Sequence, residues 1–137
     1  INGSEISGDN PELAVVLEAS RLLDERLGTK AYQGNAWIFF PSSKFNFALF
    51  WPPFFFGKIP NAVALPALRV IVVAPSSLGS GKRVSDEGKT ISISRVLAHE
   101  IAHLHTLDSV GVFAMYSARS WVREGYADWA ADSSSFG

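Results

Sequence analysis

Apolar residues near the start of the chain recur every three or four positions, a spacing that predicts an amphipathic helix. The residues that follow this spacing are Leu13, Val16, Leu17, Ser20, Leu23 and Leu27. Asp9 can cap such a helix at its start, Pro11 suits an early helical position, and Gly28 supplies a stop. We therefore expect a scaffold helix between these signals.

Runs of β-branched and aromatic residues predict strands in the middle of the chain. Residues 36–40 (AWIFF) indicate a buried strand ended by a proline, and residues 68–74 (LRVIVVA) indicate a central strand. Residues 61–65 (NAVAL) form a short extended segment, also closed by a proline. Residues 45–50 alternate in part and are a further candidate strand.

Two other stretches lack these patterns and predict loops. Residues 51–57 (WPPFFFG) cannot form a central strand, because two prolines remove hydrogen-bond donors from the ladder. The aromatic rings of this loop either fold back as a small satellite core or form an exposed binding surface. Residues 76–89 are rich in glycine, serine and charged residues, which predicts a mobile loop.

The last third of the chain predicts two helices. Ile91 and Ile93 lead into the first helix, a turn follows near residues 108–111, and the second helix runs from about Ala118 to Asp132. The expected fold is α+β: an N-terminal helix, a small twisted mixed sheet of about four strands, and these two helices. Since no repeat or linker divides the chain, we expect residues 1–137 to form a single domain.

Composition restricts the classes of partner and the kinds of metal site. Hydrophobic residues make up 47% of the chain, charged residues 18%, and the formal net charge is −1. Lysine and arginine are scattered rather than clustered, which argues against nucleic acid or an anionic membrane as the main partner. No apolar run approaches the ~20 residues of a membrane span. Because the chain has no cysteine, any metal site must be built from His, Asp and Glu.

The first residue is Ile1 rather than an initiator methionine, and the start has neither a basic region nor a long apolar run. From this we expect no signal peptide and a processed or trimmed chain. The missing start hints at a protein of the cell envelope or a secreted protein. Oligomeric state has no signature in the sequence.

The segment VLAHEIAHLH, residues 96–105, carries the candidate chemistry. At about 100° per residue, His99 and His103 lie on one helix face and can bind one metal ion. Glu100 then lies beside the ion, where it can take a proton from a metal-bound water and pass it to a leaving amine. His105 lies about 200° around the helix from His103 and is expected to be a packing or surface residue. The alternative is an ordinary helix with histidines on one face.

A catalytic zinc site needs a third protein ligand and one open position. A third histidine is excluded, because Ser109 occupies the position where such families carry it, and Thr106 replaces the glycine of their turn. Glu124 lies 21 residues after His103 and can return over the histidines if the two helices form a hairpin.

The second helix offers support for this third ligand. Asp128 is four residues after Glu124, hence on the same face, and is placed to accept a hydrogen bond from His99. Gly125 and Ala127 are small, which favours a close approach of the helices. The alternative is a solvated pair of acids on a helix surface.

The motifs HEIAH (residues 99–103) and W-x-x-E-G-x-A-D (residues 121–128) resemble those of the gluzincin zinc metallopeptidases, thermolysin and its distant relatives. The resemblance spans residues 37–132 and is closest in the two helices. It implies a zincin-like fold and a Zn²⁺-dependent peptidase that uses zinc-activated water on a peptide or protein substrate.

The resemblance also implies roles for individual residues. The metal ligands would be His99, His103 and Glu124, with Glu100 as general base and acid and Asp128 supporting a ligand. An extended peptide would pair with the backbone of residues 61–65, in particular with Asn61, Ala62 and Val63.

One departure from the gluzincin pattern concerns the C-terminus, because larger members have a further subdomain that supplies an oxyanion-stabilising side chain. Only nine residues follow Asp128, so the chain is either a minimal domain or the catalytic part of something longer. The available donors are Tyr116, Arg119, Arg123 and Tyr126. Two other hypotheses remain: a non-catalytic binding module that keeps the fold, and a latent protease blocked by its own chain.

Overall fold

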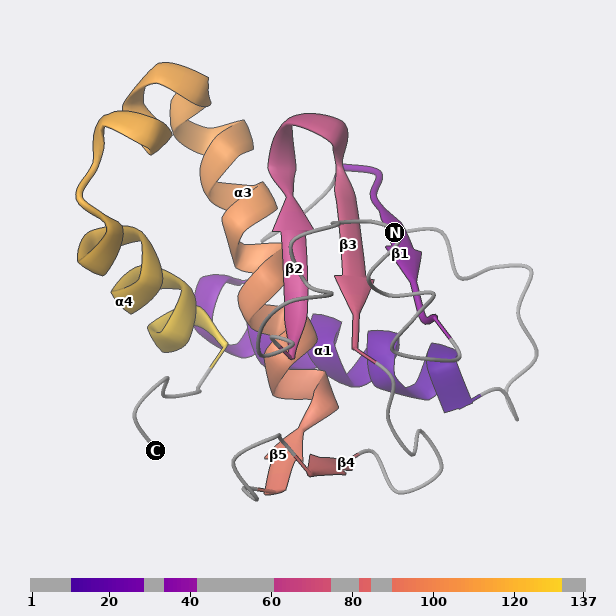
Figure 1. The fold of residues 1–137 in the computed structure, drawn as a ribbon. Coiled ribbons are helices and arrows are strands. Elements are labelled where there is room, and N and C mark those ends of the chain that lie inside the picture. Colours follow the sequence, from indigo (N-terminus) through magenta and orange to yellow (C-terminus); the bar gives the residue numbers. More distant parts are fainter. Residues whose placement is uncertain (1–10, 29–33, 42–60, 75–81, 85–89, 132–137) are drawn as a thin grey trace.

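Helices cover one face of a small β-sheet in the computed structural model, which describes residues 11–28, 34–41, 61–74, 82–84 and 90–131 (Figure 1). The predicted α+β class is confirmed. The main hydrophobic core joins α1 (Pro11–Leu27) and α3 (Ile93–Ser117) to the sheet, with α4 (Ser120–Ala130) beside α3. At its centre lie fully buried aliphatic side chains: Ile71, Ile93, Leu97, Ile101 and Leu104.

The predicted N-terminal helix is confirmed as α1, but its buried face is rotated from the expected one. Leu17 was predicted to face the core and is 59% exposed, whereas Ala19 is fully buried. Residues two positions apart on a helix point in directions about 200° apart, so Leu17 and Ala19 lie on nearly opposite faces. The apolar residues Val15 and Leu22 complete the buried stripe.

The sheet is mixed and has the strand order β1-β3-β2. Strand β3 (Val70–Val73) is central, as its β-branched sequence predicts, and it pairs in parallel with β1 (Trp37–Phe39). On its other side it pairs antiparallel with β2 (Ala62–Leu65). The described sheet has three strands where about four were expected.

The strand predicted at residues 36–40 is confirmed as β1, but the prediction that it is buried was wrong. Trp37 is 70% exposed, and its ring stacks on that of Phe39 with centroids 6.4 Å apart. Among the described strands β1 is at the edge of the sheet, and Ala36, Ile38 and Phe40 are partly buried where they pack against the core. A dense aromatic run does not distinguish an edge strand from a central one.

A second, two-stranded antiparallel ribbon pairs β4 (Lys82–Val84) with β5 (Thr90–Ser92). Strand β4 lies inside residues 76–89, which were predicted to be loop throughout, so that prediction was wrong at this strand. The candidate strand at 45–50 and the aromatic loop at 51–57 lie outside the described residues. No helix in the described ranges is both long enough and apolar enough to cross a membrane.

The two C-terminal helices form a hairpin whose turn lies later than predicted. The turn was expected near residues 108–111, but helical structure continues to Ser117, and the connection is Ala118 and Arg119. Gly111, with φ 84° and ψ 168°, separates two helical segments within Ile93–Ser117, so the helix does break inside the predicted range, but the chain reverses direction only at Ala118 and Arg119. Arg123 then closes the hairpin by donating hydrogen bonds to the carbonyls of Met115 (3.2 Å) and Ala118 (3.1 Å).

A bidentate ion pair joins the β2–β3 turn to α3. The Arg69 guanidinium donates to the two carboxylate oxygens of Asp108, at 3.0 and 2.5 Å. Arg69 itself has a left-handed conformation with φ 54° and ψ 42°, and its backbone N–H donates to the carbonyl of Pro66. This contact anchors the end of β2 on the helix that carries the histidines.

Replacing Gly111 by alanine is expected to destabilise the protein by about 1–3 kcal/mol. No atom lies within 4 Å of a Cβ at this position, but its positive φ with extended ψ is a conformation reached essentially by glycine alone. Gly125→Ala is the matched control, because Gly125 is helical with equal space and should gain about 0.5–1 kcal/mol. Urea denaturation with a chelator present measures the free energy of unfolding of both variants. A change of the same sign in Gly111→Ala and Gly125→Ala would contradict the conformation described for Gly111.

Candidate metal site and general base

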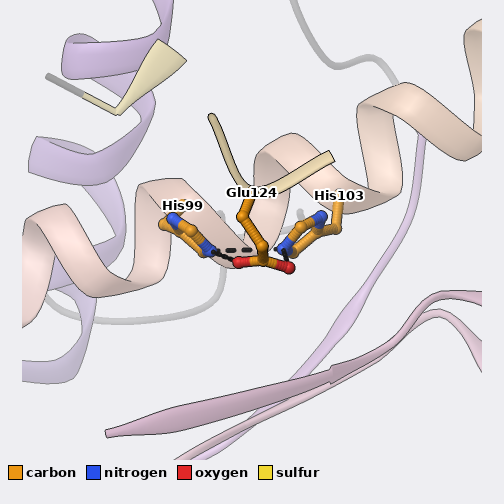
Figure 2. Close-up of side chains that lie close together, drawn as sticks. All are labelled: His99, His103 and Glu124. Carbon is orange, nitrogen blue, oxygen red and sulfur yellow. Dashed lines mark hydrogen bonds and ion pairs between the residues drawn. The ribbon is translucent and has the colours of Figure 1, made fainter. Parts of the chain in front are cut away.

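Helix α3 holds the two candidate histidines between the core and α4. The helix buries Leu97, Ile101 and Leu104 against α1 and the sheet, which fixes its rotation. His99 and His103, one turn apart, then face the side from which α4 approaches (Figure 2). His103 is buried, and the two imidazole rings meet edge to face with centroids 4.8 Å apart.

Glu124 on α4 reaches across to both imidazoles, as Figure 2 shows. Its Oε2 lies 3.1 Å from Nε2 of His99, and its Oε1 lies 3.4 Å from Nε2 of His103. The two Nε2 atoms are themselves 3.2 Å apart. The hairpin therefore brings together the three residues whose spacing suggested a metal site.

Asp128 holds His99 from the opposite side of the ring. Its Oδ1 lies 2.8 Å from Nδ1 of His99, and both side chains are mostly buried. Since a carboxylate only accepts, this contact places the proton of a neutral His99 on Nδ1 and leaves a lone pair on Nε2. The Nε2 atom, on the side of Glu124, is therefore unprotonated, which is the state in which an imidazole nitrogen binds a metal.

Of the two small residues on α4, one matches its expected packing role. Ala127 is fully buried in the core shared with α3, so its size does matter there. Gly125 is exposed, and a Cβ built on it would meet nothing within 4 Å, so the expected close approach at Gly125 was wrong.

The donor set fits a tetrahedral zinc ion. Bonds of about 2.0–2.1 Å to zinc put neighbouring tetrahedral ligands about 3.3 Å apart. The separations of 3.1, 3.2 and 3.4 Å bracket that length. The 3.1 and 3.4 Å contacts involve different carboxylate oxygens of Glu124. If one ligand atom is taken from each of the three residues, these three atoms all lie within 4.8 Å of one another. Within the described residues this is the group of His, Asp and Glu side chains able to hold a cation.

The surroundings of His103 favour its neutral form, which is the form that binds a metal. Burial lowers the pKa of His103, and the neighbouring His99 and Arg123 lower it further, against the opposing effect of Glu124 and Asp128. A neutral imidazole retains the lone pair that a metal requires.

Glu100 lies next to this cluster without joining it. Burial, followed by the negative charge of Glu124, raises the pKa of Glu100 to about 8, and a hydrogen bond from the backbone of Ala64 opposes the shift. Ala64 belongs to β2, so the carboxyl group of Glu100 lies between the histidine helix and the strand at the edge of the described sheet.

The raised pKa of Glu100 predicts a pH-dependent stability in chelator, where no cation contributes. Between the unfolded value of 4.5 and about 8, the folded chain holds a proton that the unfolded chain releases, so stability falls as pH rises through this window. At 1.36 kcal/mol per pH unit the loss is roughly 3–5 kcal/mol.

Glu100→Gln should remove this loss, because glutamine keeps the acceptor oxygen and does not ionise. Urea denaturation at pH 5, 6.5 and 8 is the measurement. Glu25→Gln, which changes an exposed carboxylate on α1, is the control and should retain the wild-type slope. Because the lowered pKa of His103 adds stability as pH rises toward 6.5, the contribution of Glu100 is read from the difference between Glu100→Gln and wild type. Equal pH slopes in these two proteins would contradict the raised pKa of Glu100.

The predicted substrate-binding strand is present as β2, and its hydrogen-bond pattern specifies which residues face outward. The carbonyl of Asn61 accepts from the N–H of Ala74, so Asn61 points its backbone into the sheet. In an antiparallel pair this direction alternates, so Val63 also faces β3, whereas Ala62 and Ala64 face away from it. Ala64 was not singled out from the sequence, although strict alternation along 61–65 could have identified it.

Of the four candidate oxyanion donors, Tyr116 lies at the end of α3, Arg119 in the connection, and Arg123 and Tyr126 on α4. Arg123 is engaged with backbone carbonyls and stacks over the ring of Tyr116 at 5.8 Å. Tyr126 packs against Trp129, and burial raises its pKa. Within the described residues no hydrogen bond or ion pair joins Tyr116, Arg119, Arg123 or Tyr126 to Glu124 or the two histidines. His105 also lies outside the cluster, as its helical position predicts.

No family model, curated protein or solved structure matches this chain. What the site can do is therefore inferred from its own side chains.

Proposed function

We propose that this chain is a zinc-dependent metallopeptidase that hydrolyses peptide bonds with Glu100 as general base. The observation that carries the proposal is the convergence of His99, His103 and Glu124 at separations of 3.1–3.4 Å. Two lone-pair nitrogens and a carboxylate packed this closely repel one another unless a cation or a proton lies between them. Three protein ligands, rather than four, are typical of catalytic zinc sites.

Each residue around the cluster has a defined part in the proposed reaction. A zinc ion held there would act as a Lewis acid and lower the pKa of water. Without a metal, the raised pKa of Glu100 keeps this side chain largely protonated at neutral pH, but the positive charge of a bound zinc ion would favour its carboxylate form. That carboxylate would accept the proton of the attacking water and return it to the departing amine nitrogen. Asp128 keeps the His99 ring in the orientation and tautomer that direct Nε2 at the metal.

The same proposal includes a gluzincin-like architecture and a peptide substrate. An antiparallel strand, β2, lies beside the histidine helix, and the helix carrying Glu124 follows as the second arm of a hairpin. An extended peptide added to the outer edge of β2 would meet the backbone of Ala62 and the carbonyl of Ala64, whose N–H already donates to Glu100. Its carbonyl would then pass close to Glu100, which is bonded to Ala64.

The proposal is tested by measuring metal content and peptide cleavage on one preparation. We expect about one zinc per chain and cleavage of an unstructured protein such as casein, abolished by a chelator and restored by added zinc. Zinc binding without cleavage of any peptide would favour a non-catalytic binding module. An absence of zinc binding would rule out the proposal.

A further inference from the structure

The tip of the α3–α4 hairpin, residues 110–122, carries a concentration of exposed apolar side chains, which we name the apolar tip. Its exposed large hydrophobic residues are Val110, Val112, Phe113, Tyr116, Trp121 and Val122. The exposed fractions reach 86% for Phe113 and 70% for Trp121. Apolar groups gathered in this way mark a binding surface for protein or membrane, whereas single exposed apolar residues do not.

The apolar tip is a formed structure rather than a frayed end. Arg123 ties the two arms together through the carbonyls of Met115 and Ala118 and lies over the ring of Tyr116. Met115 is 3% exposed and anchors the end of α3. The bend at Gly111 redirects the end of α3, and Figure 1 shows the hairpin turn lying well away from β1. The apolar side chains are therefore held outward by specific contacts.

Charge distinguishes between the kinds of partner. From Ser109 to Arg123 the chain contains no Asp or Glu, although the whole protein has 13 acidic residues against 12 basic ones. Arg119 is exposed at the turn between the two arms. Arg119 is the single charged residue of the apolar tip, so the scattered basic residues of the chain form no basic patch here. The aromatic and aliphatic side chains would supply most of the affinity for a bilayer, and Arg119 adds a preference for anionic lipid.

We propose that the apolar tip inserts into the interfacial region of an anionic lipid bilayer. Trp and Tyr rings favour the headgroup level of a membrane, and Phe and Val favour the acyl boundary just below it. Arg119 meets lipid phosphates, while the extended stem of its side chain lies along the apolar surface. The protein thus binds the bilayer peripherally, through a protrusion. This inference is independent of peptidase activity, since no residue of the apolar tip belongs to the metal site.

Co-sedimentation with sucrose-loaded vesicles tests the proposal directly. We expect the protein to bind vesicles containing phosphatidylglycerol, and to bind pure phosphatidylcholine vesicles about fivefold more weakly. Phe113→Ser and Trp121→Ser should each weaken binding about tenfold, because each removes an aromatic ring from the bilayer. Trp37→Ser is the matched control: Trp37 is also 70% exposed but lies on β1, so its loss should leave vesicle binding unchanged.

Two measurements keep the result interpretable. Circular dichroism and urea denaturation confirm that each variant is folded, and sedimentation velocity without lipid reports self-association. Failure of the wild-type protein to bind either vesicle type would overturn the proposal, as would equal losses in Trp37→Ser and Trp121→Ser. A wild-type dimer that Phe113→Ser converts to monomer would instead assign the apolar tip to a second copy of the chain.

Discussion

Glu100→Gln is expected to lower the rate of peptide cleavage by about 10²–10⁴-fold while leaving the zinc content unchanged. Glutamine matches the size of glutamate and can still accept the hydrogen bond from Ala64, but it cannot take the proton of the attacking water. Because Glu100 lies outside the group of three converging ligands, its substitution should spare metal binding. Steady-state kinetics on a fluorogenic peptide and metal analysis of the same sample measure the two quantities.

The control for this prediction is Glu25→Gln, the same chemical change at an exposed position on α1. It should leave both rate and zinc content at wild-type values. Cleavage by Glu100→Gln at a rate near that of wild type would remove Glu100 from the role of general base. Loss of zinc together with activity would instead make Glu100 part of the metal site.

Glu124→Ala is expected to weaken zinc binding by more than about 100-fold and to abolish cleavage with it. The substitution removes one of three ligands and leaves two imidazoles, which together hold the metal far less firmly. The affinity is measured by competition with a chromophoric chelator. Because Glu124 is half-exposed on α4, its loss should not unfold the chain, and circular dichroism can confirm this.

A graded series separates the ligand from its supporting carboxylate. Asp128→Asn changes the acceptor that orients His99 and should weaken zinc binding by about 10- to 100-fold, less than Glu124→Ala. Glu25→Ala, on the surface of α1, should have no effect on zinc affinity. Unaltered affinity in Glu124→Ala would show that its carboxylate does not bind the metal. Equal losses in Glu124→Ala and Asp128→Asn would remove the distinction between their roles.

Most of the candidate site could be anticipated from local periodicity. Helical spacing places His99 and His103 on one face, and the same rule pairs Glu124 with Asp128. The choice of His99 as the partner of Asp128 agrees with the 2.8 Å contact. The central position of β3 also follows from its β-branched sequence.

Other features depend on contacts between distant segments and leave little trace in local sequence. Arg69 and Asp108 are 39 residues apart, and neither belongs to a motif that would identify the other. Trp37 occupies an edge strand despite an aromatic run that is equally suited to a buried one. Gly111 was expected to end a helix, but Arg123 and Met115 hold a further helical segment beyond it.

The sequence by itself determined which side chains share a helix face, because the geometry of an α-helix is the same wherever the helix lies. Only the tertiary structure decided that α4 returns over α3 close enough to set a carboxylate within 3.1–3.4 Å of two imidazoles. It also decided that Glu100 lies partly buried beside β2, where its pKa is raised to about 8. Such distances depend on how whole elements pack, and packing is settled by the complete core rather than by the spacing of residues within one helix.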